Sequence, residues 1–445
     1  MIRHAVKRPA ITSVFPATTR SRFASAASPV TSASRSHKVV VIGGGSAGLS
    51  ISHQLLRSGH FAADDIAVVD PATWHHYQPG WTLVGGGLRD KKSLRQEMRG
   101  LIDPKLKFYH QGVATFAPDE NEVTLGNGDR LAYSQLVVAP GIEVKYDAIK
   151  GLPQALANPD TPVSSIYGYN TCDKVFQDVQ KLQQGIALFT QPAGVVKCAG
   201  APQKAMWLAS DYWRRAGRYK DAEQSPITIE FATGHPVMFG VPKYSAALDA
   251  IRRERGVEGL FQHDLVSVDG NKATFAVPDG KQPVTRHFDF LHVVPKMGPH
   301  GFVQDSVLAN EAGYVAVDPE TTQHVQYDNV WSAGDASSLP TSKTAAAITS
   351  QAPVLVRNLL LAMDGKTPAS TYDGYTSCPL TTEYGKVLLA EFKYGGVPKE
   401  SFRWLGLDQG TPRRAFYHLK KDFFPWVYFR SMVKGTWGGP SGWLK

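Results

Sequence analysis

The feature that most constrains the fold of this chain is a glycine-rich turn near its start. In the segment HKVVVIGGGSAGLSISHQLLRSG, an apolar strand leads directly into Gly43, Gly45 and Gly48, and an amphipathic helix follows. In units of this kind the first glycine permits the tight turn, the second lets the backbone approach a pyrophosphate, and the third lets helix and strand pack closely. The segment therefore predicts a Rossmann-type domain that binds a dinucleotide.

An acidic residue downstream supports that interpretation. The next apolar strand, DDIAVVD, ends at Asp70. Asp70 lies roughly 20 residues beyond the turn, where an acid commonly accepts hydrogen bonds from the ribose hydroxyls of the ligand. A glycine turn with a purely structural role is the alternative, and the strand, the helix and Asp70 together favour the dinucleotide site.

A second motif far along the chain indicates which dinucleotide is bound. In YDNVWSAGDASSLPTSKTAAAITSQAPVLVRNLL a strand ends at Gly334 and Asp335, and an alanine-rich helix follows a loop. This segment resembles the second flavin motif of flavoprotein reductases with two dinucleotide-binding domains, and the resemblance implies FAD. In those enzymes the aspartate holds the ribityl chain, and the positive end of the next helix stabilises the reduced flavin. An ordinary loop with a capping aspartate is the alternative.

The region between the two motifs predicts a second domain of related architecture. Strand GIALFT is followed by QPAGVVKCAGAPQK, where a nicotinamide-binding domain would carry its glycine triad, and strand ITIEFATG also leads to a helix without one. We therefore expect a Rossmann-like skeleton that has lost the pyrophosphate turn. Reduction by NADH or NADPH is disfavoured, and an atypical nicotinamide site is the alternative.

Positive charge is concentrated at the N-terminus. The first acidic residue is Asp64, and residues 1–37 are rich in Ser, Thr and Ala and contain six basic residues. This composition is typical of a mitochondrial transit peptide, with residues 20–25 as the expected cleavage zone, and a disordered basic tail is the alternative. Loss of residues 1–37 lowers the net charge from +9 to +3, so the charge does not indicate a nucleic-acid partner.

Hydropathy predicts attachment to a membrane surface rather than a spanning helix. The most apolar stretch, VLVRNLLLAM, is shorter than the roughly 18 residues needed to span a bilayer and contains Arg357. Residues 413–437 interleave eight aromatic residues with six Lys or Arg and one acid, which suits the headgroup zone of a bilayer. Pro425 is expected to divide them into two short amphipathic pieces. A buried aromatic stripe is the alternative to this monotopic contact.

Cysteine usage points to sulfur chemistry. The chain has three cysteines, Cys172, Cys198 and Cys378, and no CxxC or HExxH motif, so neither a metal site nor an iron–sulfur cluster is predicted. Lys197 precedes Cys198 and a helix carrying Lys204 follows it, which favours a thiolate. Cys378 is expected in a loop ahead of a strand. A pair with Cys198 in a mitochondrial protein would indicate catalysis rather than a structural disulfide, and two unconnected buried cysteines are the alternative.

Four segments together resemble one enzyme family. VVKCAGAPQK, GDASSLPTSKTAAA, YDGYTSCPL and YQPGWTLVGGG are similar to segments of the mitochondrial-type sulfide:quinone oxidoreductases, and the similarity covers residues 38 to 440. The resemblance implies an α/β fold with tandem Rossmann-like domains of the FAD-dependent disulfide-reductase type and a C-terminal membrane-docking region. It also implies a redox couple of Cys198 and Cys378 beside FAD, with ubiquinone on the opposite face of the flavin ring.

The resemblance also assigns individual residues. Besides the glycines Gly43, Gly45, Gly48 and Gly334, it places at FAD Ser46, Ala47, Asp70, Gln78, Val113, Asp335, Lys343, Ala345 and Ala346. Lys204, Lys343 and Lys420 are cations expected to favour hydrosulfide and thiolate or to supply charge near the quinone oxygen. For Lys420 a contact with lipid headgroups is the alternative. Cys172 matches no motif of the family and is expected to be a bystander.

The activity that the resemblance implies is the oxidation of hydrogen sulfide. Hydrosulfide would attack a disulfide between Cys198 and Cys378, Cys378 would keep the persulfide, and Cys198 would donate into the flavin. Electrons would pass to ubiquinone at the mitochondrial inner membrane, and the sulfane sulfur to a small acceptor such as glutathione, sulfite, cyanide or coenzyme A. Three alternatives stay open: a type II NADH:quinone dehydrogenase, a flavocytochrome-type sulfide dehydrogenase and a non-enzymatic flavoprotein.

The motifs divide the chain into five expected segments. A transit peptide covers residues 1–37, the first part of the FAD domain 38–150, and the second Rossmann-like domain, with Cys198, 151–295. The second part of the FAD domain follows over 296–365, and a C-terminal region with Cys378 and interfacial helices covers 366–445.

Overall fold

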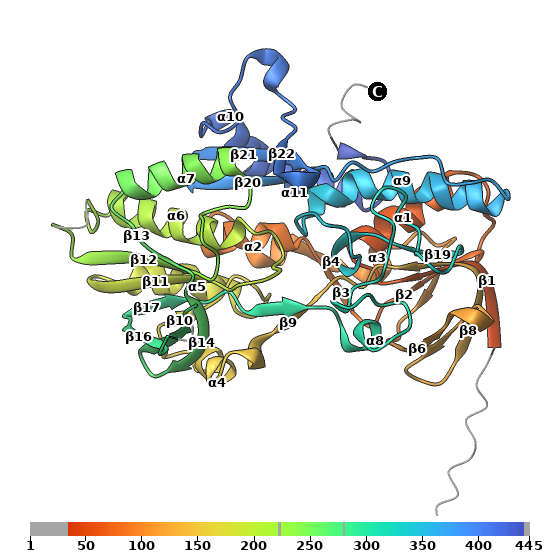
Figure 1. Ribbon diagram of the computed structural model, residues 1–445, viewed down its shortest axis with the longest axis horizontal. Helices are drawn as coiled ribbons and strands as arrows, with labels where there is room; N and C mark the ends of the chain where they lie inside the picture. Colours follow the sequence, from red (N-terminus) through yellow and green to blue (C-terminus); the bar gives the residue numbers. More distant parts are fainter. Residues whose placement is uncertain (1–33, 221–223, 279–280, 440–445) are drawn as a thin grey trace, which may run out of the picture.

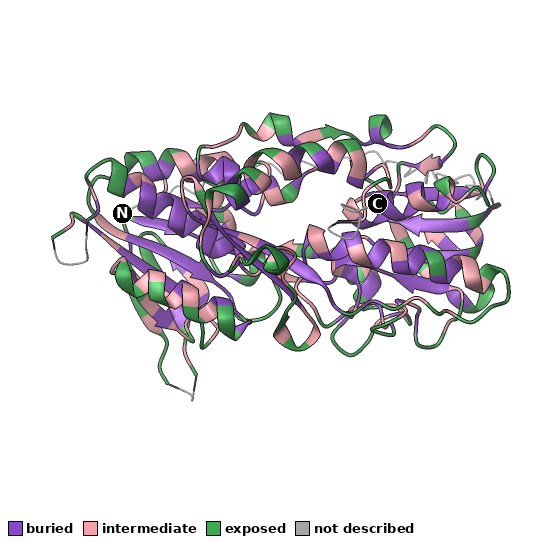
Figure 2. Ribbon diagram, turned by 90° about the horizontal axis from the view of Figure 1, so that it is seen from above, coloured by how far each residue is buried: buried purple, intermediate pink, exposed green. Residues whose placement is uncertain are grey.

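Two α/β lobes make up the described part of the chain. The computed structural model describes residues 34–220, 224–278 and 281–439, so most of the expected transit peptide lies outside the described residues. In Figure 1 the N-terminal strands form one lobe, the middle of the chain forms the other, and the C-terminal segments lie across the upper side. Figure 2 shows buried strands within both lobes and exposed residues on the outward helix faces. The predicted α/β architecture is confirmed.

The first lobe is built on a seven-stranded sheet. Parallel strands lie in the order β5, β2, β1, β8, β19, which is the Rossmann order, and β7 and β6 continue antiparallel from the start of β8. The bounds are β1 Ser34–Ile42, β2 Ile66–Val69, β5 Lys107–Tyr109, β6 Val113–Ala117, β7 Glu122–Leu125, β8 Arg130–Val138 and β19 Val330–Ser332. Because β1 pairs with β8 from Ser34 onward, the expected boundary after residue 37 cuts through a strand.

The glycine turn joins β1 to α1 (Ser46–Arg57), and its three glycines have different roles. Gly43 adopts a φ of +98°, and a Cβ there would lie 2.4 Å from the carbonyl oxygen of Ala139. A Cβ on Gly48 would lie 1.8 Å from the carbonyl oxygen of Gly43. A Cβ on Gly45 would meet nothing within 4 Å. Gly43 and Gly48 therefore allow backbone segments to pack closely around the turn, and Gly45 leaves open space beside it.

The second lobe has a parallel sheet of its own. Its strands lie in the order β10, β17, β11, β12, β13. The bounds are β10 Val163–Ser164, β11 Gly185–Gln191, β12 Ile227–Thr233, β13 Glu258–Phe261 and β17 Phe290–His292, with helices α5 Cys172–Lys181, α6 Ala201–Arg215 and α7 Pro242–Glu254. Residues 192–200, which include Cys198, join β11 to α6 in place of a glycine triad. The lobe has the Rossmann-like skeleton expected from the sequence.

Two short strands connect the lobes. β9 (Glu143–Lys145) leaves the first lobe and β18 (Lys296–Gly298) returns to it, and the two pair in antiparallel register (Figure 1). This pairing holds the two connections between the lobes side by side. The smaller elements are β3 Trp74–His76, β4 Arg95–Glu97, β14 Asp264–Asp269, β15 Lys272–Ala276, β16 Val284–His287, α2 Trp81–Gly85, α3 Met98–Leu101, α4 Leu152–Ala157 and α8 Gly301–Gln304.

The C-terminal region begins with an antiparallel sheet of three strands, β20 (Thr376–Glu383), β21 (Lys386–Lys393) and β22 (Val397–Pro398). The prediction that Cys378 lies in a loop is wrong, since it lies within β20 opposite Ala390. Pro379 does not interrupt this strand because β20 is at the edge of the sheet, where one row of N–H groups needs no partner strand.

A continuous helical segment follows from Arg414 to Met432. The helices α10 (Arg414–His418) and α11 (Phe424–Val427) alternate with π turns at Leu419–Phe423 and Tyr428–Met432. The prediction that Pro425 divides this segment is wrong. Pro425 lies in the first turn of α11, after a wider π turn, and a missing N–H is tolerated there.

The aromatic residues of this segment are divided between core and surface. Phe416 and Tyr417 pack into a buried cluster with β21, and Tyr428 belongs to the buried core of the first lobe. The expected membrane-facing stripe is therefore wrong for these three rings. Trp426 is 57% exposed, and Trp404, in the loop between β22 and α10 that projects upward in Figure 1, is 77% exposed.

One helix of the described ranges, α9 (Ala345–Met363), is long and apolar enough to cross a membrane by length and composition. It is longer than the apolar stretch seen in the sequence because it begins at Ala345, after Thr344 caps its first turn. Half of its apolar window is buried in the protein, and it packs along α1. These contacts are those of a core helix.

The different roles of the glycines can be tested by urea unfolding. Gly48→Ala should lower the free energy of unfolding by more than about 4 kcal/mol or prevent folding, because the clash is with backbone that cannot move away. Gly45→Ala, measured on protein freed of its dinucleotide, should change it by less than about 1 kcal/mol, since Gly45 already has an extended conformation open to alanine and the added methyl meets no protein atom. Equal losses in both variants would contradict this assignment.

Candidate functional site

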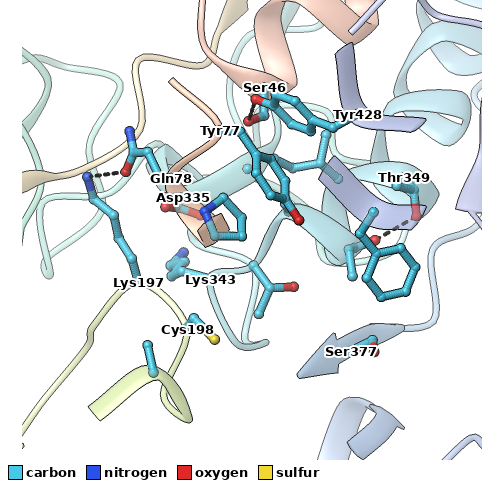
Figure 3. Close-up of a pocket in the computed structure, with 18 of the residues that line it drawn as sticks. Ser46, Tyr77, Gln78, Lys197, Cys198, Asp335, Lys343, Thr349, Ser377 and Tyr428 are labelled. Carbon is cyan, nitrogen blue, oxygen red and sulfur yellow. Dashed lines mark hydrogen bonds between the residues drawn. The ribbon is translucent and has the colours of Figure 1, made fainter. Parts of the chain in front are cut away.

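A cavity of about 460 Å³ lies where the two lobes and the C-terminal region meet. Its wall includes the start of α1, the segment around Cys198, the start of α9, strands β20 and β21, and the helical segment 414–432. Figure 3 shows residues from these segments facing one space, with the sulfur of Cys198 pointing into it. Parts of the chain that are far apart in sequence therefore share one site.

Most of the sequence-predicted cofactor residues line this cavity. They are Gly45, Ser46, Ala47, Gln78, Gly334, Asp335, Lys343, Ala345 and Ala346. Gly43 and Gly48 lie behind the turn and are not part of the wall, and neither are Asp70 and Val113. Asp70 follows β2, where its carboxylate accepts hydrogen bonds from the N–H groups of Gly44 (2.6 Å) and Ala72 (2.7 Å). Val113 begins β6.

The two cysteines expected to form a couple lie side by side. The Sγ atoms of Cys198 and Cys378 are 3.3 Å apart, and both residues are free thiols. Cys198 is partly exposed and lines the cavity, whereas Cys378 is 1% exposed. A disulfide requires about 2.05 Å between sulfurs, so its formation needs a movement of little more than about 1 Å.

The backbone around Cys198 is held in an unusual conformation. Its φ is +56°, in the left-handed region that residues other than glycine seldom adopt. Its N–H donates to the carbonyl of Lys343 (2.8 Å), and its carbonyl accepts from the N–H of Ala201 (2.8 Å). A Cβ on Gly200 would lie 2.5 Å from the Sγ of Cys378, so a glycine at this position lets β20 approach the start of α6. Strain of this kind is common in functional sites.

Charge and hydrogen bonding make Cys198 the thiolate of the pair. The hydrogen bond from Cys378 holds the pKa of Cys198 well below its usual range, and the positive charges of Lys204 and Lys420 act in the same direction. The Nζ of Lys204 lies 3.1 Å from the Cys198 Sγ. The pKa of Cys378 is raised well above normal, first because it donates to Cys198 and second because it is buried.

The three sequence-predicted lysines line the cavity, and all are buried. Burial alone would lower the pKa of Lys204, but the neighbouring thiolate raises it above its ordinary value. Burial and the charge of Lys204 lower the pKa of Lys420 to about 7, and burial lowers the pKa of Lys343 to about 8. Lys420 donates to the carbonyl of Pro79 (2.9 Å). At 2% exposure it is not in contact with lipid headgroups.

The C-terminal segment closes one side of the cavity through Tyr428. Its hydroxyl lies 2.5 Å from the Oγ of Ser46 (Figure 3) and 2.7 Å from the Nε2 of His75. His75 also contacts the carbonyl of Gly44 (2.9 Å) through Nδ1, and burial lowers its pKa to about 4, so it is neutral. The glycine turn is therefore bonded to a segment almost four hundred residues away.

Lys197 does not act as the sequence suggested. It was expected to favour the thiolate of Cys198, but it donates to the Oε1 of Gln78 (3.1 Å), and burial lowers the pKa of Lys197. Tyr428 and Glu391 line the cavity and were missed by sequence reasoning, as was Gly200 behind the wall. The closeness of Gly200 to Cys198 in the sequence was its only signal. For Tyr428 and Glu391 there was none, because an aromatic residue in a helix and an acid in a strand are ordinary patterns.

Cys172 lies apart from the cavity wall. It is fully buried at the start of α5, its Sγ is 3.7 Å from the carbonyl oxygen of Tyr169, and burial raises its pKa to about 12. This environment suits an unreactive thiol. Within the described ranges, no group of three or more His, Cys, Asp or Glu side chains is arranged to hold a metal ion.

Comparisons with known proteins show which proteins this chain is similar to. Residues 37–352 match the family described as pyridine nucleotide-disulphide oxidoreductase. The mitochondrial sulfide:quinone oxidoreductase of Schizosaccharomyces pombe is 46% identical over 431 residues, covering 92% of this chain and 93% of that protein. The protein of the same name from Dictyostelium discoideum is 44% identical, covering 90% and 87%. The solved sulfide:quinone oxidoreductase of Aquifex aeolicus shares the fold, with a TM-score of 0.72 at 16% identity, covering 93% of this chain and 94% of that one.

The assignment of the thiolate can be tested by alkylation of the reduced protein. Iodoacetamide should modify Cys198 at pH 7 and leave Cys172 and Cys378 unmodified, because only a thiolate reacts. Lys204→Gln should raise the pKa of Cys198, so that its rate at pH 7 falls about tenfold for each pKa unit and recovers as pH rises. Peptide mass spectrometry across pH measures both effects.

A matched control is Lys296→Gln, which removes a lysine paired with Asp264 in the second lobe. Its pH profile should equal that of the unsubstituted protein. An unchanged profile in Lys204→Gln would contradict the proposed stabilisation of the thiolate.

Proposed function

Because the chain belongs to the sulfide:quinone oxidoreductases, within the pyridine nucleotide-disulphide oxidoreductase family, we propose that it oxidises hydrogen sulfide and passes the electrons to a quinone. One observation supports this proposal above the others. The sulfurs of Cys198 and Cys378 face each other beside the cavity, and the ammonium of Lys204 contacts the sulfur of Cys198.

The residues of the cavity fit FAD, the cofactor of this family. A Cβ on Gly45 would enter open space in the cavity. Because glycine has no Cβ, a pyrophosphate can approach the backbone closely at this position. The N-termini of α1 and α9 both line the cavity, through Ser46 and Ala345, and helix N-termini favour negative groups. Asp335 offers a half-buried carboxylate in the cavity wall to hydroxyl donors. When bound, FAD supplies two-electron redox chemistry.

We propose that the other residues implied by the resemblance complete this binding site. Gln78, Lys343 and Ala346 line the same space as Gly45. Asp70 is assigned to the ribose, because it follows β2 at the carboxyl edge of the sheet next to the turn. Val113 is assigned to the same end of the cofactor by its place at the start of β6.

The sulfur chemistry uses the two cysteines in their oxidised form. Hydrosulfide attacks the Cys378 side of the disulfide, the bond between the two cysteine sulfurs breaks, and Cys198 leaves as a thiolate carrying the electron pair. Cys198 suits the leaving role because Lys204 stabilises its negative charge. Cys378 keeps the persulfide, whose outer sulfur passes to a small acceptor such as glutathione or sulfite. A small acceptor is required because Cys378 is buried.

The apolar part of the cavity suits a quinone ring. It is lined by Leu389, Phe402, Leu419, Phe424, Met432 and Trp437. Lys420 stands in the same wall, and its pKa of about 7 lets it hold or release a proton near neutral pH. We assign ubiquinone to this region.

A type II NADH dehydrogenase is not favoured. The connection from β11 to α6 has no glycine triad and holds Cys198 instead. A dehydrogenase of that class would have no need for Cys378 against Cys198. Electron transfer to a haem partner and a non-enzymatic role are distinguished from the proposal by the titration below.

The mitochondrial inner membrane is the proposed site of action. The related proteins are named as mitochondrial, and the basic N-terminal residues have the composition of a transit peptide. Contact with the membrane is assigned to the loop between β22 and α10 together with α11, because Trp404, Leu405 and Trp426 are exposed there. This replaces the aromatic stripe expected from the sequence.

Anaerobic titration tests the activity. Sulfide should bleach the flavin of the purified protein, and a short-chain ubiquinone analogue should restore its colour. NADH should leave the spectrum unchanged. Bleaching by NADH and not by sulfide would exclude the proposal.

The cysteines are tested by the same titration with Cys198→Ser and Cys378→Ser. Each variant should retain its flavin and lose at least about 10³-fold in turnover, because a disulfide cannot form. Cys172→Ser is the control and should behave as the unsubstituted protein. Normal turnover in either of the first two variants would refute the assigned roles.

Membrane contact is tested by sedimentation with vesicles of phosphatidylcholine and cardiolipin. Trp404→Ser combined with Leu405→Ser should weaken binding by at least about tenfold, since burial of each apolar side chain contributes about 1.5–3 kcal/mol. Val307→Ser removes an apolar side chain that is 61% exposed elsewhere, and it should have no effect. Equal binding by all variants would exclude this loop as the contact.

A further inference from the structure

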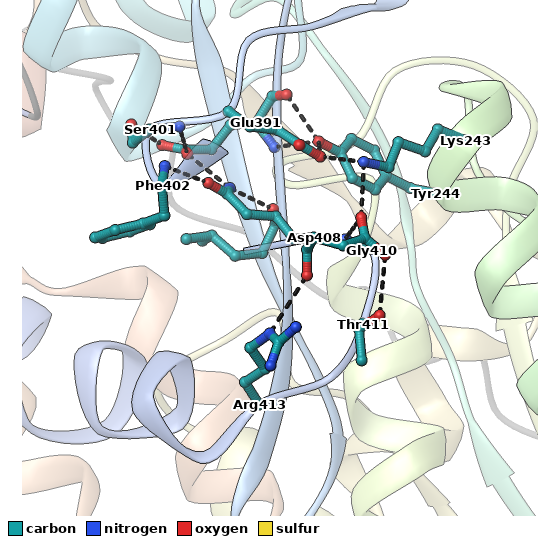
Figure 4. A network of polar contacts seen from close by, with 12 residues as sticks. Lys243, Tyr244, Glu391, Ser401, Phe402, Asp408, Gly410, Thr411 and Arg413 are labelled. Atoms are coloured by element: carbon teal, nitrogen blue, oxygen red, sulfur yellow. Dashed lines mark hydrogen bonds and ion pairs between the residues drawn. The ribbon is translucent and has the colours of Figure 1, made fainter. Parts of the chain in front are cut away.

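A buried carboxylate, Glu391 on β21, forms a hydrogen-bond network that the sulfur chemistry does not use (Figure 4). Glu391 is 3% exposed. Its Oε1 accepts from the hydroxyls of Tyr375 (2.5 Å) and Ser401 (2.9 Å), and its Oε2 accepts from the N–H of Ser401 (2.7 Å) and from the Nε2 of Gln409 (2.8 Å). Each of these side-chain donors is neutral, so no lysine or arginine is bonded to this carboxylate in the network.

The network lies on the wall of the cavity. Glu391, Tyr375 and Ser401 all line it, together with the apolar residues assigned to the quinone. Glu391 on β21 pairs with Ser377 on β20. The next pair along the two strands is Ala390 with Cys378. A carboxylate and a phenol are therefore held at the site where a quinone would be reduced.

The other end of the network reaches the surface. Ser401 is half-buried and begins the loop that carries Trp404. The main-chain N–H of Lys399, whose side chain is half exposed, donates to the main-chain carbonyl of Glu391 (2.9 Å). The hydroxyl of the half-buried Ser401 is the group that joins the Glu391 carboxylate to this partly exposed loop.

Other charged and titratable groups lie around the network without bonding to the carboxylate of Glu391. They are Tyr244, Lys243, Glu400, Asp408, Lys399 and Asp373. Lys243 is neutralised by Glu400 and Asp408, and Lys399 by Asp373. Glu400, Asp408 and Asp373 are therefore bonded to lysines and lie outside the cavity wall, whereas Glu391 lines the cavity.

Reduction of a quinone requires protons as well as electrons. A quinone takes up two electrons and two protons to become a hydroquinone, whereas oxidation of hydrosulfide to the sulfane level releases two electrons and one proton. One further proton must therefore come from solvent in each turnover. Lys420 stands in the same wall and can hold one proton, since its pKa is about 7, so a second group is needed for the proton that comes from solvent.

We propose that Glu391 and Tyr375 carry that proton from solvent to the quinone oxygen. The carboxylate takes a proton on the Ser401 side. Tyr375 gives its hydroxyl proton to the quinone oxygen as the electron pair arrives, and Glu391 returns a proton to Tyr375. Burial raises the pKa of Tyr375 well above its usual range, which keeps the hydroxyl protonated between turnovers. In this scheme Tyr375 touches the substrate, and Glu391 acts through it.

The inference rests on the proposed function for the identity of the quinone, and the experiment measures the quinone step separately. The flavin is reduced anaerobically by light with EDTA as the electron donor, instead of by sulfide, and is then mixed with the short-chain ubiquinone analogue in a stopped-flow spectrometer. Glu391→Gln and Tyr375→Phe should each slow reoxidation about 10²-fold, the usual contribution of a general acid. Bleaching by sulfide should remain at the unsubstituted rate in both variants.

Two further measurements separate a proton relay from a structural role. Added formate, a small proton carrier, should restore reoxidation in Glu391→Gln. The thermal unfolding midpoint of this variant should be lowered, because an amide cannot accept from all four donors to the carboxylate, and formate should leave that lowered midpoint unchanged. Glu400→Gln is the matched control, because Glu400 belongs to the same network through Tyr244 but is not part of the cavity wall. It should reoxidise normally.

Normal reoxidation in Glu391→Gln, or equal slowing in Glu400→Gln, would overturn the inference. So would slow reoxidation in Glu391→Gln that formate does not restore. Failure of sulfide to bleach the unsubstituted protein would instead count against the proposed function, and the photoreduced measurement would still decide the role of Glu391.

Discussion

The contact between the ammonium of Lys204 and the sulfur of Cys198 is the interaction on which the site depends. Lys204 is buried and Cys198 is half-buried, so their opposite charges are only weakly screened at a separation of 3.1 Å. Cys198 is held at a positive φ, and Gly200 leaves room for Cys378 to approach it. Geometry and charge therefore act together: the backbone brings the sulfurs to 3.3 Å, and Lys204 decides which of them carries the negative charge.

The C-terminal region completes the cavity. Strand β20 supplies Ser377 and Pro379 to the wall and places Cys378 behind Cys198, strand β21 supplies Glu391, and the helical segment beyond them supplies Lys420 and Tyr428. Tyr428 is bonded to the glycine turn, so the segment that closes the proposed quinone region is also anchored beside the proposed cofactor region. Exposed Trp404 lies in the loop held by Glu391 through Ser401 and Gln409. The surface proposed to meet the membrane is thus connected to the cavity by a short series of hydrogen bonds.

The sequence predicted local features well. The turn of Gly43 and Gly48 and the strands on either side of it were placed correctly, because they depend on residues that are neighbours in the chain. It failed where one element decides the structure of another. Pro379 suggested a loop, but an edge strand accepts proline. The aromatic residues of 413–437 suggested a membrane surface, but three of them pack onto β21 or the first lobe.

By itself, the sequence determined the family and the two Rossmann-like sheets, and it predicted Cys198 and Cys378 as a pair with the thiolate at Cys198, because short motifs of fixed spacing encode a turn or a helix N-terminus. Only the tertiary structure decided that the two sulfurs lie 3.3 Å apart, that Lys420 is buried with a pKa of about 7, and that Glu391 faces the cavity. These properties depend on burial and on charges supplied by distant segments. A side chain's environment is set by what packs against it, and no local pattern records that.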